Sequence, residues 1–258
     1  MSSFEETMTE MARLDEDVLS RPWMWRGGKM DARYAFYRAL EEAQEAVISA
    51  TVGERSESRR ILALAQRAFG DLRGLLVGLP DSLLDQAPRP GDWPVRDVLR
   101  HVLLTERRYA LQTEYAIQRS DADPMRIPDA RLPGLDQIDV SGDVRTVLAR
   151  IGDARAETTR RVGDVEPAAM TRPATWVHYD VDVRFRLHRF AAHVEEHTIQ
   201  CEKTLAALGW RETEGRRIVR RIWSHVGELE GLGARDALAN LETLVAERAR
   251  SVTASAER

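Results

Sequence analysis

The segment from Val183 to Leu208, VRFRLHRFAAHVEEHTIQCEKTLAAL, decides the fold, because it predicts one long helix without an internal Pro or Gly. At about 100° per residue, its large apolar side chains fall on one stripe that would pack in a core. His193 and His197 lie at the edge of that stripe, whereas His188 points to the opposite, polar side. The segment is therefore predicted to be a core helix with two inward-facing histidines.

The two inward-facing histidines form an H-x-x-x-H pattern, which places them one turn apart on the same helical face. Two imidazoles so placed can bind one metal ion, and a third ligand must then come from another helix. His101 is the histidine that lies at the edge of an apolar face elsewhere in the bundle region. On spacing alone, hydrogen-bonded histidines at a helix interface remain the alternative.

Helical periodicity continues through the rest of the chain, and Pro or Gly residues separate the periodic segments. Four long helices are predicted between residues 56 and 208, so the fold class is all-α. Proline-containing segments at 80–93, 120–141 and 164–180 are predicted to be loops, and no alternating strand pattern of useful length occurs. The prediction is a four-helix bundle with long crossover loops and extra N- and C-terminal helices.

The domain organisation that follows has three parts. Residues 1–55 are predicted to be an N-terminal helical extension, residues 56–209 the four-helix bundle, and residues 210–258 a C-terminal helical extension with two helices. The length of 258 residues is enough for one large domain with such extensions.

Composition excludes several functional classes. The chain is 43% hydrophobic and 31% charged, which suits a globular protein with a buried core. Its net charge of −4 gives no electrostatic reason to expect a nucleic-acid partner, and the arginines between 216 and 221 are interpreted as a solvated helix face. One cysteine, Cys201, cannot form an internal disulfide, and no apolar run approaches the length of a membrane span. We expect a cytoplasmic protein without a membrane partner.

Two sequence motifs together resemble the DinB-like superfamily. The first is W-P-V-R-D-V-L-R-H at 93–101, and the second is H-V-E-E-H-T-I-Q-C-E-K-T-L-A-A-L-G at 193–209. In that superfamily one His follows a W-(S/T/P)-x-x-(D/E)-x-L-x-H pattern on the second helix, and two come from an H-x-x-x-H on the fourth helix with a Gln three positions later. The corresponding positions in this chain are His101, His193, His197 and Gln200.

The resemblance, which covers about residues 56–209, implies a four-helix bundle that binds a divalent metal, typically Zn or Ni. It also implies a small-molecule substrate, because characterised relatives are S-transferases and isomerases that use low-molecular-weight thiols such as mycothiol, bacillithiol or glutathione. Homodimers are frequent in the superfamily. The leading hypothesis is therefore a metal-dependent thiol S-transferase with metal ligands at His101, His193 and His197.

Other side chains near the histidines receive weaker assignments. Gln200 lies on the same side of the helix as His197 and is predicted to hydrogen-bond an imidazole or a bound thiol. Glu106 and Glu196 are further candidates for such a role, although a surface position is favoured for Glu196. Tyr109 and Trp93 are expected in the core, and the cavity is expected beneath the loops at 80–93 and 120–141. No residue is assigned as catalytic.

Two rival functions remain open at this stage. Metal-assisted hydrolysis predicts a carboxylate or histidine base beside the metal, and the sequence offers no clear one. A non-enzymatic bundle, in which the metal is structural or the pocket only sequesters a ligand, predicts a fourth protein ligand. His178, in the loop before the last bundle helix, is the residue to suspect for that position. The terminal helices are expected either to cover the bundle within one chain or to exchange between two copies.

Overall fold

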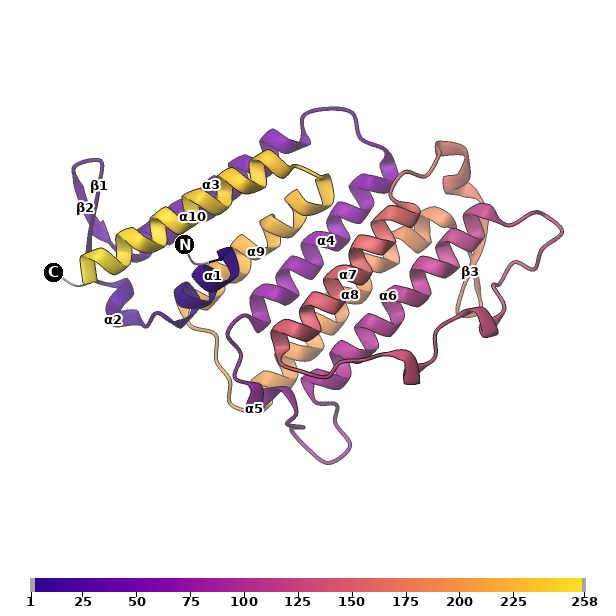
Figure 1. Cartoon of the computed structure of the whole chain (residues 1–258), viewed down its shortest axis with the longest axis horizontal. Coiled ribbons are helices and arrows are strands. Elements are labelled where there is room, and N and C mark those ends of the chain that lie inside the picture. The colour runs from indigo at the N-terminus through magenta and orange to yellow at the C-terminus, as the bar shows by residue number, and fades with distance from the viewer. Residues whose placement is uncertain (1–2, 257–258) are drawn as a thin grey trace.

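The computed structural model describes residues 3–256, with side chains up to residue 253. Four long helices, α4 (Glu57–Leu76), α6 (Val95–Gln118), α7 (Val144–Val162) and α8 (Val183–Ala207), lie side by side in Figure 1. Helix α8 packs against α4 and α6, and α7 closes the ring by packing against the same two helices. The predicted all-α four-helix bundle with long crossovers is therefore confirmed.

Side-chain caps explain where three of these helices begin. The Ser56 hydroxyl accepts from the Arg59 amide, Asp143 caps α7, and Asp182 caps α8 through the Phe185 amide. Such caps satisfy amide groups that have no partner within the helix. Pro94 is the residue before α6 and offers no side-chain cap. The long helix predicted from Val183 is confirmed, and it ends within one residue of the prediction.

The two ends of the chain form a second group of helices on the outer face of α4. This group comprises α1 (Phe4–Arg13), α2 (Glu16–Leu19), α3 (Arg33–Thr51), α9 (Glu214–Leu232) and α10 (Arg235–Ala256). Helix α9 packs along α4 and α3, and α10 packs against α3 (Figure 1). The group has its own apolar core, which includes Phe36, Ile222 and Val245. The terminal segments thus cover one face of the bundle within a single chain.

Helices α4 and α9 approach each other closely because glycines line both sides of the contact. A Cβ atom on Gly70 would lie 2.2 Å from the Trp223 carbonyl oxygen, and one on Gly227 would lie 2.3 Å from the Gln66 carbonyl oxygen. No real side chain fits at such distances. The two helices can therefore pack in this way only because glycine occupies these positions.

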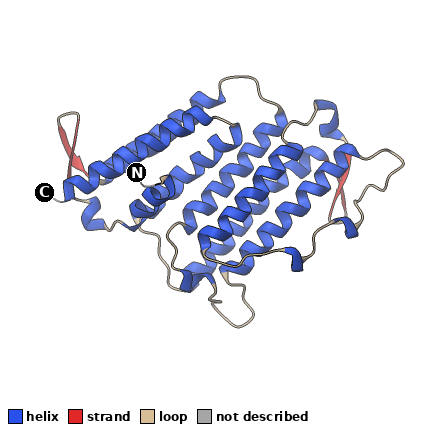
Figure 2. Ribbon diagram, in the orientation of Figure 1, coloured by secondary structure: helices blue, strands red, loops and turns tan. Residues whose placement is uncertain are grey.

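Two short antiparallel hairpins interrupt the helical architecture (Figure 2). They are β1 (Pro22–Trp25) with β2 (Gly28–Asp31), and β3 (Pro173–Trp176) with β4 (Tyr179–Asp182). The sequence analysis expected no strands, and it was wrong here because four residues are too few to establish a period of two. The second hairpin lies directly before α8, where a loop was predicted.

Apart from the β3–β4 hairpin, the regular structure in the described crossovers is short helical segments. They are α5 (Asp81–Leu84), η1 (Asp129–Arg131), η2 (Leu135–Gln137) and η3 (Pro167–Thr171). Within residues 3–256, no helix combines the length and the apolar character that crossing a membrane requires.

The arginines at the start of α9 are not a uniformly solvated face, which corrects the sequence interpretation. Arg216 is buried and donates to the carbonyl oxygen of Val77 at 2.9 Å. Arg220 forms an ion pair with Asp71 at 2.5 Å. The two remaining arginines, at 217 and 221, are exposed as predicted.

Candidate metal centre

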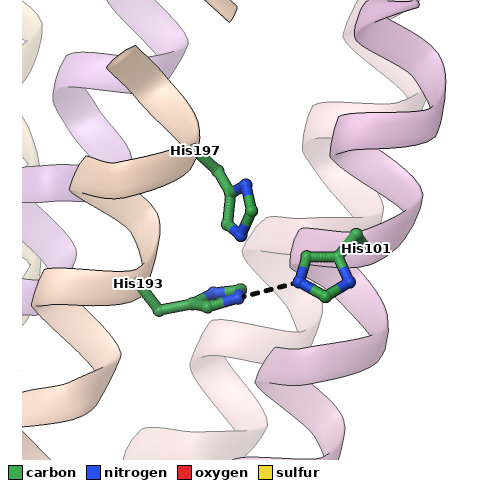
Figure 3. Close-up of side chains that lie close together, drawn as sticks. All are labelled: His101, His193 and His197. Carbon is green, nitrogen blue, oxygen red and sulfur yellow. Dashed lines mark hydrogen bonds between the residues drawn. The ribbon is translucent and has the colours of Figure 1, made fainter. Parts of the chain in front are cut away.

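Three histidines converge where α6 meets α8 (Figure 3). His193 and His197 are buried on α8, and His101 is half-buried on α6. The Nε2 atoms of His101 and His193 lie 3.2 Å apart, and one ring nitrogen from each residue falls within 4.8 Å of the others. Two imidazole nitrogens bound tetrahedrally to zinc lie about 3.3 Å apart, given Zn–N bonds of about 2.0–2.1 Å. The three residues are therefore placed to bind a metal ion.

Burial favours the neutral, metal-binding form of two of these imidazoles, those of His193 and His101. Desolvation, followed by the neighbouring His197 and His101, lowers the pKa of His193 to about 2. Burial is also the main cause that lowers the pKa of His101, with the neighbouring His197 second and Glu196 opposing it. A neutral imidazole has a lone pair to donate, whereas a protonated one has none. The site is thus prepared for a cation near neutral pH.

Gln200 orients one of the three rings. Its Oε1 atom lies 2.8 Å from Nδ1 of His197. A carbonyl oxygen only accepts, so Nδ1 of His197 carries the proton and Nε2 keeps the free lone pair. The predicted contact between Gln200 and an imidazole is present in the structure, although a contact with a bound thiol stays a prediction.

The triad opens into a cavity of about 540 Å³. One wall comes from the crossover after α6, through Met125, Arg126 and Ile127, and another from the β3–β4 hairpin. The loop at 80–93 was expected to cover this space, but its residues do not line the cavity. Residues 175–177 of the hairpin line the cavity instead.

Two aromatic residues that were expected in the core belong to the site. Tyr109 lines the cavity with its ring 5.6 Å from the His193 ring, and its hydroxyl accepts a 3.0 Å hydrogen bond from Nε1 of Trp176. Trp93 is 46% exposed, with its ring 5.6 Å from that of His101. Tyr109 also packs against an apolar core, as predicted, whereas the core prediction was wrong for Trp93, which lies in the loop before α6, where helical periodicity gives no information.

Only Glu196, of the two candidate glutamates, lines the cavity that the triad faces. Glu106 is buried away from the metal centre, where Arg155 donates to it at 2.9 Å and the Thr158 hydroxyl at 2.5 Å. Glu196 lines the cavity with the triad, and its carboxylate lies 3.7 Å from the Arg189 guanidinium. Glu196 is solvent-exposed as expected, but it is exposed at the cavity, one residue before His197.

No other His, Cys, Asp or Glu joins the triad in the part of the chain that the structure describes. His178 is exposed in the turn between β3 and β4, so the structure does not place it as a fourth ligand. His188 is exposed on the opposite side of α8, as predicted. Burial raises the pKa of the Cys201 thiol to about 12, which makes it unreactive near neutral pH.

Comparison with known proteins identifies the family of this chain. The sequence profile of the DinB superfamily matches residues 64–201, just over half of the chain. This chain belongs to the DinB superfamily. A solved structure that resembles it is YfiT from Bacillus subtilis, described as a probable metal-dependent hydrolase with an unusual four-helix bundle topology. The two chains are 15% identical, with a TM-score of 0.49, and the match covers 62% of this chain and 93% of YfiT. No curated protein matches the chain.

The arginines that line this DinB-superfamily site were not predicted from sequence, and Arg186 is the buried one among them. Arg186 is buried on α8 beside Gln112 of α6, and both line the cavity. Arg186 lies seven residues before His193, so the two share a helical face. That spacing was the available indication that Arg186 belongs to the site. The sequence does not show, however, whether an arginine on an apolar face is buried or extends its side chain to solvent.

Proposed function

We propose that this DinB-superfamily protein binds one divalent metal ion through His101, His193 and His197 and uses it to activate a low-molecular-weight thiol for transfer to an electrophile. The observation that carries the proposal is the convergence of three imidazoles, without a fourth protein ligand among the described residues, on a cavity large enough for a small molecule. Three imidazole ligands suit Zn or Ni, which are the metals we propose.

The bound metal would supply positive charge that favours the thiolate form of a coordinating thiol. In the transfer, the thiol proton goes to solvent and the sulfur forms a bond to the electrophilic carbon. The group on that carbon departs with the electron pair of the broken bond. The chain offers no thiol of its own for this purpose, since Cys201 is fully buried and outside the cavity.

The residues around the triad would position the reactants. Gln200 fixes the His197 ring through the contact at Nδ1, so that the remaining nitrogen keeps its orientation. The hydrogen bond between Trp176 and Tyr109 ties the hairpin to α6 and closes one side of the cavity. Both contacts would hold the site in a fixed shape before the substrates enter, which lowers the entropic cost of bringing them together.

Metal-assisted hydrolysis is a second candidate, and the position of Glu196 favours it. This carboxylate shares the cavity with the three histidines, where it could accept a proton from an attacking water. The sequence alone offered no such base. Replacement by Gln removes the base but keeps the shape, so E196Q distinguishes the candidates: it should abolish hydrolysis and leave S-transfer within about threefold, an effect well below the usual contribution of a general base.

The thiol proposal is tested with protein loaded with Co(II), whose complexes with sulfur absorb in the near ultraviolet. Titration with 2-mercaptoethanol should produce a sulfur-to-cobalt charge-transfer band, and ethylene glycol at the same concentrations should not. A band with the thiol supports S-transfer. Binding of cobalt without any thiol band would contradict it and leave hydrolysis or a structural metal.

We also propose that residues 56–209 act as the metal-binding unit and that residues 1–55 and 210–258 are extensions that stabilise it. A homodimer is part of the proposal, by analogy with the superfamily. Sedimentation equilibrium at micromolar concentration tests it: a mass near twice the 29.2 kDa of one chain is expected, and a single-chain mass would contradict it.

A further inference from the structure

Arg186 is a buried cation whose hydrogen bonds all go to neutral acceptors. Its side chain lies on α8, and the residue is only 4% exposed. Its Nε donates to the Thr113 hydroxyl at 3.3 Å, one Nη to the Thr175 carbonyl oxygen at 2.5 Å, and the other Nη to Oε1 of Gln112 at 2.5 Å. A guanidinium has five N–H bonds, so one on each Nη nitrogen is left for another acceptor.

A buried guanidinium normally has a carboxylate beside it, because removing an unpaired charge from water is costly. This chain follows that rule at Arg155, which is buried on α7 and forms a bidentate pair with Glu106. Within the described part of the chain, Arg186 forms no ion pair with any Asp or Glu, although it lines an open cavity. The missing partner is therefore expected to enter that cavity as a ligand.

The rest of the cavity lining supports an anionic ligand. Arginines at 108, 126, 186 and 189 line it, and Glu196 is the single acidic residue among the lining positions. Arg126 pairs with Asp129 and Arg189 with Glu196, so among the described residues Arg108 and Arg186 are the lining arginines without an ion pair. Arg189 adds a second indication, because its buried Nε atom has no hydrogen-bond partner. A cavity with fixed positive charge attracts anions from solution.

The arginines and the histidines are spaced for one small molecule to reach both. Arg186 and Arg189 precede His193 by seven and four residues, which corresponds to about 10 Å and 6 Å along the helix axis. Both lie on the face of α8 that lines the cavity, as His193 does. A molecule about 6–10 Å long that binds at the histidines can therefore contact the guanidinium groups with its other end.

We propose that the Arg186 end of the cavity is a carboxylate subsite, and that the small molecule this protein acts on is a carboxylic acid. The two remaining N–H groups of Arg186 belong to one planar guanidinium. They can donate to the two oxygens of a carboxylate, which is also planar. That the acid reacts at the histidines rests on the proposed function, whereas its binding to Arg186 does not.

The test uses the metal-free full chain, so that it does not depend on the metal chemistry. Benzoate serves as the probe and benzamide, which has the same shape without the charge, as its control, with binding measured by isothermal titration calorimetry. Benzoate should bind at least about tenfold more tightly than benzamide, the effect of one charge-assisted contact. R186K should lose about tenfold in benzoate affinity, and the matched control R217K, at an exposed position on α9, should bind as wild type does.

Equal binding of benzoate and benzamide by the wild-type chain would overturn the proposal, as would no benzoate binding at all. So would a folded R186K chain with wild-type affinity, because binding would then lie elsewhere. The wild-type comparison decides the matter even if R186K does not fold. His193→Ala lacks a metal ligand but keeps Arg186, so it should still bind benzoate. This variant therefore distinguishes failure of the metal site from failure of the carboxylate subsite.

Discussion

Helices α4 and α9 meet through glycines, whereas α6 and α8 meet through histidines, an arginine and a glutamine. At the first interface the backbones touch, and Gly70 and Gly227 leave no room for a side chain. At the second interface polar groups are buried, and a cavity of about 540 Å³ remains between the helices. The first arrangement maximises packing, while the second retains buried polar groups at a cost in stability. The α4–α9 contact therefore depends on close approach of the backbones, whereas the α6–α8 contact presents polar side chains to a cavity.

The largest effect is expected from Gly70→Ala at the α4–α9 interface. The added methyl group would lie 2.2 Å from the Trp223 carbonyl oxygen, so the helices must move apart. We expect the free energy of unfolding to fall by about 2–3 kcal/mol, the cost of overpacking, measured by urea denaturation. Metal content should not change, because the triad lies on the other side of the bundle.

Gly152→Ala on α7 is the matched control for that substitution. The nearest atom to its added methyl group would be Cε1 of Phe69 at 3.7 Å, an ordinary contact distance. Alanine favours the helix over glycine, so this variant should be more stable by about 0.5–1 kcal/mol. Equal destabilisation of both variants would contradict the close approach of α4 and α9.

The second effect concerns the stability of the metal-free protein as a function of pH. His193 has a pKa near 6.5 when unfolded and about 2 when folded, so between these values only the unfolded chain binds the proton. Its contribution to stability is complete above pH 6.5 and is lost as the pH falls towards 2. Each pH unit below 6.5 should lower the free energy of unfolding by about 1.4 kcal/mol.

His193→Gln removes that titration, so its stability should decline less steeply than that of wild type between pH 6.5 and 5. His188→Gln, at an exposed position on the same helix, should follow the wild-type curve. Parallel curves for wild type and His193→Gln in urea denaturation would show that His193 is not held neutral by the fold.

The smallest effect is expected from Gln200→Ala, which leaves all three ligands in place. Loss of the 2.8 Å contact to Nδ1 frees the His197 ring, and metal affinity should fall by about tenfold, the lower end for such supporting residues. Competition with a chelator measures the affinity, and Ile199→Ala, at an exposed neighbour, is the control. Unchanged affinity would mean that packing alone orients His197.

Much of the fold could be predicted from sequence because α8 is long, periodic and free of breakers. The predicted segment began at Val183 and overran the helix by one residue. The triad could be predicted because H-x-x-x-H fixes a geometry within one helix, and the superfamily motif supplied the partner at His101. These features depend on the spacing of residues along the chain, which can be read directly from the sequence.

The parts that sequence did not predict depend on contacts between distant segments. The β3–β4 hairpin has four-residue strands and a turn in which Val177 has φ 56, a conformation rare for a β-branched residue. The role of Arg186 could not be predicted because it depends on the residues around it in space, which are neutral acceptors and the lining of an open cavity. The position of Glu196 could not be predicted for the same reason, because its side chain is exposed at the cavity rather than on the outer surface.

The central claim is that the three histidines bind a metal, and metal content tests it most directly. Untagged wild type, His193→Ala and the control His188→Ala are incubated with Zn(II) or Ni(II), desalted and analysed by elemental mass spectrometry. We predict about one ion per chain in wild type and His188→Ala, and far less in His193→Ala, which keeps only two ligands. Wild type without bound metal, or His193→Ala with the same content as wild type, would contradict the account.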